Sequence, residues 1–282
     1  MATPQAALTK PVRKPASPDG ATVLPRLDAC LLLGIAIAFA AIVAGLHAAG
    51  VSLNYFLQPV AAAIVLGGTL GIMLVTTPPY ALMDSARRVM SLISAQDADR
   101  AALIDEIVEY ARRARRDGVY SLEPQIADAS NPMLRHALEL SMDITNHGEL
   151  RSVLESELQM TERKGEADAK ALEVAGGFAP TLGIIGTVIG LVEVLRQFSN
   201  AAGPVGSGIG SAFVSTIYGL ALANFLLLPV AHRIRARVAE NFETQELIME
   251  GVLGLATSNH PAVIRMRLAS FLRGNRTERD AS

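Results

Sequence analysis

Hydroxyl side chains stand inside two long apolar runs of this sequence, where an oxygen atom has few partners besides the backbone. Thr187 lies in the run VAGGFAPTLGIIGTVIGLV, and Ser215 and Thr216 lie in a later run. Such a hydroxyl can bond a carbonyl of its own helix, or it can offer its oxygen to a hydrated cation or a carboxylate. Each residue alone favours the first role. If they face one another on neighbouring helices, they would line a polar path for an ion.

The acid that an ion path normally needs is missing from these runs. A protein that moves ions by itself usually keeps a titratable side chain inside the membrane. Here Asp28 and His47 fall at the two ends of one run, and Glu193 falls near the end of another, three residues before Arg196. We prefer an i, i+3 ion pair for Glu193, with a role in the ion path as the alternative. If H+ or Na+ crosses here, another subunit must supply the switching carboxylate.

Other kinds of chemistry find no support in the sequence. Cys30 is the single cysteine, and neither a Cys/His cluster nor HExxH, a phosphate-binding loop or a nucleophile with a base is present. We therefore expect no enzyme activity, no metal site and no cofactor. A net charge of -2 gives no basic excess for nucleic acid. Only 18% of the residues are charged, against about 25% in soluble proteins.

The apolar residues are gathered into four runs, each close to the roughly 20 residues that a helix needs to cross a bilayer. They cover residues 27–49, 59–77, 171–195 and 209–231. A signal peptide is the alternative for the first run, but the polar segment before it is too long and another span follows closely. We predict four transmembrane helices and a membrane protein in contact with lipid.

Basic residues give the orientation of these helices. Residues 1–26 hold four Lys and Arg, residues 78–170 hold twelve, residues 232–282 hold eight, and the connections at 50–58 and 196–208 hold only Arg196. Because cytoplasmic loops are enriched in Lys and Arg, both termini and the long middle segment are predicted to be cytoplasmic. The predicted divisions are a disordered tail (1–26), a first transmembrane hairpin (27–77), a cytoplasmic loop (78–170), a second hairpin (171–231) and a helical C-terminal region (232–282).

Helical patterns fill the cytoplasmic loop, and strand signals are absent. One helix keeps Leu103, Ile107 and Ala114 on one face and should end at Gly118. Asn131 followed by Pro132 should begin a second helix. A third, from about residue 149, should run on into the third span. The fold class is therefore all-α, a polytopic membrane protein with a large helical cytoplasmic insertion.

Small residues and prolines recur in the spans. Glycines at helical spacing allow close approach of two backbones, within one chain or between chains, and both alternatives stay open. These candidate helix-packing residues are Gly67, Gly71, Gly183, Gly186, Gly190 and Gly219. Pro180 and Pro229 lie at similar depth near the cytoplasmic ends of their spans, where each removes a backbone donor, and they mark a plausible hinge level.

Longer segments resemble the MotA/PomA family, the A subunits of bacterial flagellar stators within the MotA/TolQ/ExbB superfamily. The resemblance covers nearly all of the chain after the N-terminal tail. It is carried by GGFAPTLGIIGTVIGLV at 176–192, STIYGLALAN at 215–224, LIMEGVLGL at 247–255 and NHPAVIRMRLASFL at 259–272. The related ExbB/TolQ group, which energises outer-membrane processes, is the alternative. It has one span before the loop and an external N-terminus, so the predicted two-span hairpin favours the stator.

The resemblance implies a ring of A chains, five around two helices of a MotB/PomB-like B subunit, in the bacterial inner membrane. An aspartate of the B subunit would carry H+ or Na+, and the ring would exert torque on a FliG-like rotor switch protein. The family's ion-path threonines fall on Thr187 and Thr216, and its functional prolines on Pro180 and Pro229. Its cytoplasmic rotor contacts fall on Arg115, Arg116 and Glu123.

Two departures from the family stand beside the rotor contacts. Asp117 adds an acid, and Pro124 directly follows Glu123, so the electrostatic fit to a rotor is expected to differ. Without the resemblance, these arginines would read as an ordinary solvated helix end, where cations favour the C-terminal dipole.

Overall fold

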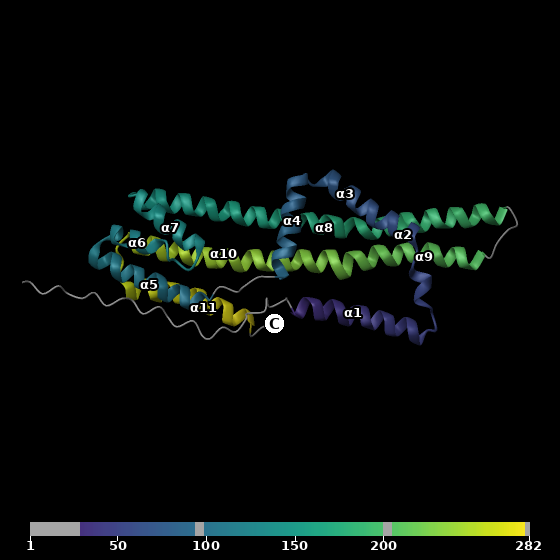
Figure 1. The fold of residues 1–282 in the computed structure, drawn as a ribbon, viewed down its shortest axis with the longest axis horizontal. Helices are drawn as coiled ribbons and strands as arrows, with labels where there is room; N and C mark the ends of the chain where they lie inside the picture. The colour runs from purple at the N-terminus through teal and green to yellow at the C-terminus, as the bar shows by residue number, and fades with distance from the viewer. Residues whose placement is uncertain (1–28, 94–98, 200–204, 280–282) are drawn as a thin grey trace, which may run out of the picture.

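Helices make up all the regular structure in the part of the chain that the computed structural model describes, residues 29–93, 99–199 and 205–279. The predicted disordered tail at 1–26 lies outside the described residues. Figure 1 shows an elongated molecule in which two long antiparallel helices run side by side along most of its length.

The first long helix is α8, His147–Ser199, and it spans 53 residues without a break. At 1.5 Å per residue it is roughly 80 Å long, well over the ~30 Å of a bilayer core. Its partner is formed by α9 (Val205–Ala221), the π-helical η4 (Leu222–Leu227) and α10 (Leu228–Ala256) in succession. Both long helices therefore continue directly from a membrane span into the cytoplasmic part, as predicted for the third span.

The N-terminal hairpin completes the membrane part. It consists of α1 (Ala29–Ala48), the short 3-10 turn η1 (Leu53–Phe56), and a second helix formed by α2 (Pro59–Ala62), the π-helical η2 (Ala63–Gly67) and α3 (Gly68–Thr76). Three helices of the described chain are long and apolar enough to cross a membrane, and the shorter apolar helix Leu33–Ala48 is the fourth. The predicted all-helical, multi-span fold is confirmed.

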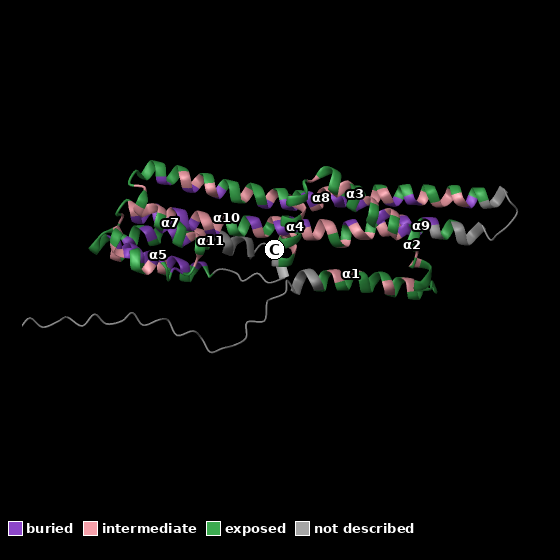
Figure 2. Cartoon of the chain, turned by 45° about the horizontal axis from the view of Figure 1, so that its top comes forward, coloured by how far each residue is buried: buried purple, intermediate pink, exposed green. Residues whose placement is uncertain are grey.

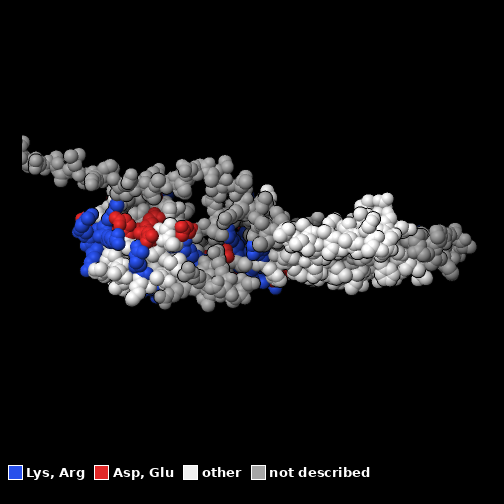
Figure 3. All heavy atoms as spheres, turned by 90° about the horizontal axis from the view of Figure 1, so that it is seen from below, with Lys and Arg blue, Asp and Glu red and all other residues white. Residues whose placement is uncertain are grey.

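Apolar side chains face outward along this half of the molecule. Val188 is 54% exposed and Leu220 is 47% exposed, and exposed and half-buried residues alternate along α8 and α9 in Figure 2. In Figure 3 the charged side chains gather at the opposite half, over the cytoplasmic helices. The two halves thus have the surfaces suited to lipid and to water.

One large apolar core, among the described residues, holds the cytoplasmic half together. It joins α5 (Arg100–Asp117), α7 (Pro132–Asp143) and α11 (Pro261–Arg279) to the outer parts of α8 and α10. Between α5 and α7 lie the 3-10 turn η3 (Val119–Leu122) and the short α6 (Glu123–Ile126). Gly118 ends α5 with a φ of 87°, and the Asn131 side chain accepts hydrogen bonds from the backbone at the start of α7. Both predicted helix boundaries are confirmed.

A buried arginine fastens the start of α5 to α10. The Arg100 side chain donates to the Thr244 hydroxyl at 3.1 Å and to the Glu240 carbonyl at 2.9 Å. It also makes an ion pair of 2.7 Å with Glu243. Hydrogen bonds from a charged group are stronger than neutral ones, so α5 is held to the long helix at its first turn.

A separate helix, α4 (Pro79–Ile93), directly follows the second span. It lies across α8 and α10 instead of along them, at the junction between the apolar and the charged halves (Figure 1). For this segment the sequence pattern predicted only a helical cytoplasmic loop.

Candidate functional site

Two of the three predicted hydroxyls meet between α8 and α9. The Oγ1 atoms of Thr187 and Thr216 are 2.6 Å apart, which is hydrogen-bond distance. Thr187 Oγ1 also lies 3.1 Å from the Gly183 carbonyl and 3.0 Å from the Ala212 carbonyl. A hydroxyl has one proton and two lone pairs, so Thr187 can donate to only one of these carbonyls while it accepts from Thr216. The pair is half-buried and can exchange bonding partners without moving the backbone.

Ser215 is placed differently from the other two hydroxyls. Its Oγ is buried, has no hydrogen-bond partner among the described residues, and is directed against the backbone of α8 at Gly186. A Cβ at Gly186 would overlap this oxygen. Ser215 therefore stands outside the Thr187–Thr216 pair, contrary to the expectation that the three hydroxyls share one lining.

Glycines bring the backbones of α8 and α9 into direct contact around the hydroxyl pair. A Cβ at Gly219 would lie 2.5 Å from the Ala179 carbonyl oxygen, and one at Gly183 would lie 2.9 Å from the Ser215 carbonyl oxygen. At Gly190 the nearest backbone atom would be 3.0 Å away, on Ala212. Side chains at these positions would push the helices apart, so this glycine stripe sets the spacing at which the hydroxyls meet.

The glycines of the second span do not share in this packing. A Cβ at Gly67 or Gly71 would meet nothing within 4 Å, whereas one at Gly68 would lie 2.8 Å from the Leu182 side chain. Of the two alternatives left open for Gly67 and Gly71, the described chain shows no packing within it, and contact with another chain stays a prediction. The sequence contains two adjacent glycines, Gly67 and Gly68, and either could have packed against α8. Their spacing alone does not tell which of them faces that helix.

The two carboxylates of the third apolar run are both paired near its ends. Glu193 forms an ion pair of 3.0 Å with Arg196, which confirms the preferred interpretation of that residue. Glu173, overlooked in the sequence, forms an ion pair with Arg235 of α10, and Lys170 lies 3.6 Å away. These pairs keep both acids away from the hydroxyl pair.

The Glu173–Arg235 pair also gives the relative depth of the prolines. Pro180 lies seven residues beyond Glu173 in α8, and Pro229 lies six residues before Arg235 in the antiparallel helix. At 1.5 Å per residue both prolines are roughly 10 Å from the ion pair on the membrane side. Pro229 is the second residue of α10, just after the π-helical η4, whereas α8 passes through Pro180 without interruption. A wide turn before a proline is a common site of helix bending.

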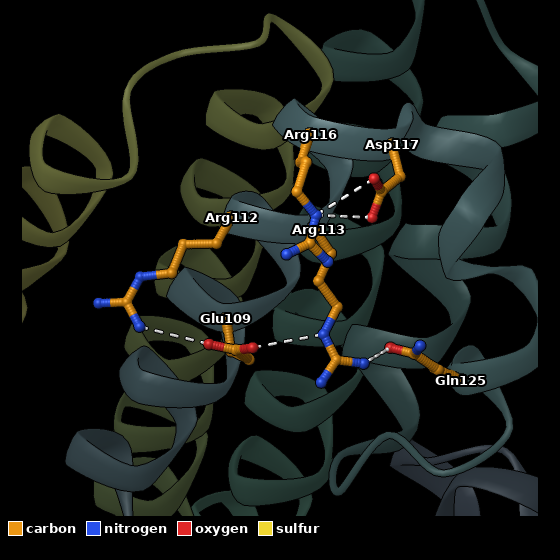
Figure 4. Close-up of polar contacts among 6 residues, drawn as sticks. All are labelled: Glu109, Arg112, Arg113, Arg116, Asp117 and Gln125. Atoms are coloured by element: carbon orange, nitrogen blue, oxygen red, sulfur yellow. Dashed lines mark hydrogen bonds and ion pairs between the residues drawn. The ribbon is translucent and has the colours of Figure 1, made fainter. Parts of the chain in front are cut away.

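At the far cytoplasmic end, most arginines of α5 have a partner within the chain (Figure 4). Glu109 accepts from Arg112 and from Arg113, each at 3.3 Å. Arg113 is also hydrogen-bonded to Gln125 of α6. Arg113 thereby joins α5 to α6 and has a structural role that the sequence pattern did not distinguish from that of its neighbours.

The predicted rotor-contact residues fall into two groups. Arg116 pairs at 3.0 Å with Asp117, the acid that departs from the family pattern. Arg115 and Glu123 are exposed, and neither makes an ion pair or a side-chain hydrogen bond with another described residue. They present uncompensated charges of opposite sign at the end of the molecule, suited to a partner with the complementary pattern.

A tyrosine on the same helix does not add to this charge. Burial and the neighbouring Glu106 carboxylate raise the pKa of Tyr110 to about 12. Glu106 accepts from the Tyr110 hydroxyl at 3.2 Å and from the Ser130 backbone amide at 3.0 Å, and so holds the segment before α7 against α5. Within the described residues, no group of three His, Cys, Asp or Glu side chains could hold a metal ion.

Two family models match the chain. The MotA/TolQ/ExbB proton channel family matches residues 125–246, and the motility protein A N-terminal model matches residues 32–118. Motility protein A of Bacillus subtilis (strain 168) is 30% identical over 251 residues, 87% of this chain and 91% of that protein. Chemotaxis protein PomA of Vibrio alginolyticus is 26% identical over 246 residues, 87% of this chain and 96% of that protein.

Solved structures show the same fold. The flagellar MotAB stator complex from Bacillus subtilis has a chain with a TM-score of 0.78 and 27% identity, covering 89% of this chain and 98% of that one. The structure of C. jejuni MotAB has a TM-score of 0.81 at 23% identity, covering 87% of this chain and 96% of that one.

The glycine contacts make a testable prediction. Gly219→Val should lower the melting temperature of the purified protein by several degrees, because overpacking of this kind costs about 1–3 kcal/mol. Gly210→Val, which adds the same side chain on the same helix where nothing lies within 4 Å, is the matched control and should melt close to the parent. Equal melting temperatures for the two variants would contradict the assignment of Gly219 to the α8–α9 contact.

Proposed function

Because this chain belongs to the MotA/TolQ/ExbB proton channel family and is a stator A subunit of the flagellar motor, we propose that it houses a moving cation whose carrier carboxylate comes from a B subunit. One observation carries the proposal. The Thr187–Thr216 pair lies between two spans with no acid beside it, since Glu173 and Glu193 are ion-paired near the ends of their run. Two hydroxyls can solvate a cation or hydrogen-bond a carboxylate, but they cannot carry the charge across.

The proposed partner is a MotB/PomB-like subunit whose membrane helix brings an aspartate to the hydroxyl pair. The solved relatives are structures of MotAB, which supports such a complex. Several copies of this chain would form a ring, a homopentamer, around the B helices. The open faces of Gly67 and Gly71 are available for contacts within that ring.

The energy for torque would come from the ion gradient. One charge crossing 100 mV releases about 2.3 kcal/mol, which is enough to shift the balance between two helix packings of similar free energy. Protonation or sodium binding at the partner's carboxylate would change its bonding to Thr187 and Thr216. The helix bend would take place at the level of Pro180 and Pro229, where η4 already widens one helix.

The long helices would carry this motion to the rotor. α8 and α10 pass from the hinge level into the cytoplasmic core without a loop, and Arg100 fastens α5 to α10. A small angular change near the membrane would thus displace the far end of α5, where Arg115 and Glu123 would contact a FliG-like switch protein. Both termini would lie in the cytoplasm, with the spans in the inner membrane.

Ion conduction tests the proposal most directly. The purified chain alone in liposomes should pass no current under a proton or a sodium gradient, because it lacks an intramembrane carrier acid. Reconstituted with its B subunit, it should conduct, and the gradient that drives the current identifies the ion. Robust current from the chain alone would overturn the borrowed-carboxylate mechanism.

The hinge assignment has its own test. Pro229→Leu restores a backbone donor after η4 and should stiffen the helix there, so membrane insertion should be kept while swimming is lost. Pro132→Leu, at the exposed first residue of α7, is a control that changes proline content away from the spans and from the rotor contact. Normal swimming of the Pro229 variant, at normal expression, would refute the hinge.

Charge reversal tests the rotor contact. Arg115→Glu should reduce swimming speed several-fold, because it reverses an uncompensated charge, and a reciprocal reversal on the rotor should partly restore it. Arg112→Glu is the matched control on the same helix, since Arg112 is already paired with Glu109. If both variants swim alike, Arg115 belongs to an ordinary solvated helix end.

A further inference from the structure

Helix α9 is held from two opposite sides at nearly the same depth. On one side Thr216 meets Thr187 of α8. Tyr218 follows two residues later, which is roughly 3 Å along the helix axis and about 200° around it. On this second side α9 contacts η1, α2 and η2 of the N-terminal hairpin. The helix that carries one of the two paired hydroxyls is therefore packed between two partners.

The Tyr218 hydroxyl bonds the turn that joins η1 to α2. It donates to the Phe56 carbonyl, and its oxygen lies 3.4 Å from the backbone nitrogen of Gln58. The same nitrogen is 3.0 Å from the Phe56 carbonyl oxygen. Hydroxyl, carbonyl and amide thus form one closed group, which fastens the outer turn of the first hairpin to α9.

The backbone of this turn needs such a partner. Leu57 and Gln58 have ψ angles of 78° and 97°, outside the helical range, so neither η1 nor α2 includes them. Non-helical backbone beside a membrane span is tolerated where protein groups satisfy it, and a tyrosine hydroxyl packed against protein needs a partner in return. Figure 1 shows α8 and α9 extending beyond the turn between α1 and α2, so the turn lies beside the helix pair and not at its outer end.

We propose that Tyr218 is a positioning residue for the ion path, because its bond to the outer turn fixes the rotation of α9 about its own axis. The Thr216 hydroxyl and the backbone contact at Gly219 already hold α9 against α8. Both contacts lie on one side of the helix, so they leave it free to rock about that line. The bond on the opposite side supplies the second point that fixes the direction of the Thr216 oxygen. This role rests on the proposed ion path.

A second tyrosine in the same turn provides a matched control. Tyr55 is 61% exposed, and its hydroxyl bonds no other residue in the part of the chain that the structure describes. Tyr55→Phe and Tyr218→Phe each remove one phenol oxygen and keep the ring. Only the second change removes a bond between the hairpin and α9.

Hydrogen exchange in the complex with the B subunit tests the bond itself. The backbone amides of residues 53–58 should exchange several-fold faster in Tyr218→Phe than in the unsubstituted complex, and Tyr55→Phe should leave them unchanged. Equal exchange in the two variants would overturn the proposal. Rapid exchange of the Gln58 amide in the unsubstituted complex would also overturn it, even if Tyr218→Phe does not assemble.

Ion flux into liposomes that hold the complex tests the positioning role, with flux measured against external sodium concentration and against external pH. If sodium is the ion, Tyr218→Phe should raise the half-saturating concentration several-fold at an unchanged maximal flux, because the oxygens that bind the cation are less well placed. If protons are the ion, the half-saturating pH should rise, because hydroxyls that no longer donate to the ionised carboxylate leave its protonated form favoured.

The remaining outcomes separate this inference from the proposed function. An unchanged flux curve, a lower maximal flux at an unchanged half-saturating concentration, or the same shift in Tyr55→Phe would overturn the positioning role. Absence of flux from the unsubstituted complex would contradict the proposed ion path, and hydrogen exchange would still decide whether Tyr218 holds the turn. Faster exchange and a shifted half-saturating concentration in Tyr218→Phe alone are the results expected of a positioning residue.

Discussion

The direct contact between the backbones of α8 and α9 is the constraint on which the rest of this molecule depends. Glycines at 183, 190 and 219 let the two helices approach until one helix's carbonyls touch the other's backbone. Only at that spacing do the Thr187 and Thr216 hydroxyls come within hydrogen-bond distance. In a bilayer, where lipid is as apolar as leucine, such close packing is a main source of helix association. The polar pair and the helix pair therefore stabilise each other.

The same two helices connect the membrane part to the cytoplasmic part. α8 is one unbroken helix, and the only change of helical type in its partner is the π-helical η4 at the proline level. Below the prolines, the Glu173–Arg235 pair and the α4 contact at Asp168 hold the boundary region together. Beyond them, Arg100 and the apolar core fix α5 on α10. The packed spans thus lie on one side of the proline level, and the boundary region and cytoplasmic core lie on the other. Both sides resist deformation, so the helix pair would bend at the proline level.

The charges at the cytoplasmic tip are divided by the same kind of local packing. Arg113 is used to join α5 to α6, and Arg112 and Arg116 are compensated by Glu109 and Asp117. Among the charged residues of α5 and α6, this leaves Arg115 and Glu123 uncompensated. Neutralised charges contribute little to recognition at a distance, whereas unpaired ones of both signs can steer and orient a partner.

The sequence by itself determined the spans and the helix boundaries at Gly118 and Asn131, because these follow from hydropathy and capping along one helix. The family resemblance pointed to Thr187, Thr216, Arg115 and Glu123.

Tertiary structure alone decided that Gly68 and not Gly67 or Gly71 meets α8, that Ser215 turns away from the hydroxyl pair, and that Arg116 is compensated. It also revealed the transverse α4 and the Glu173–Arg235 pair. Periodicity assigns residues to a face of a helix, but the neighbour of that face depends on contacts between segments far apart in the chain.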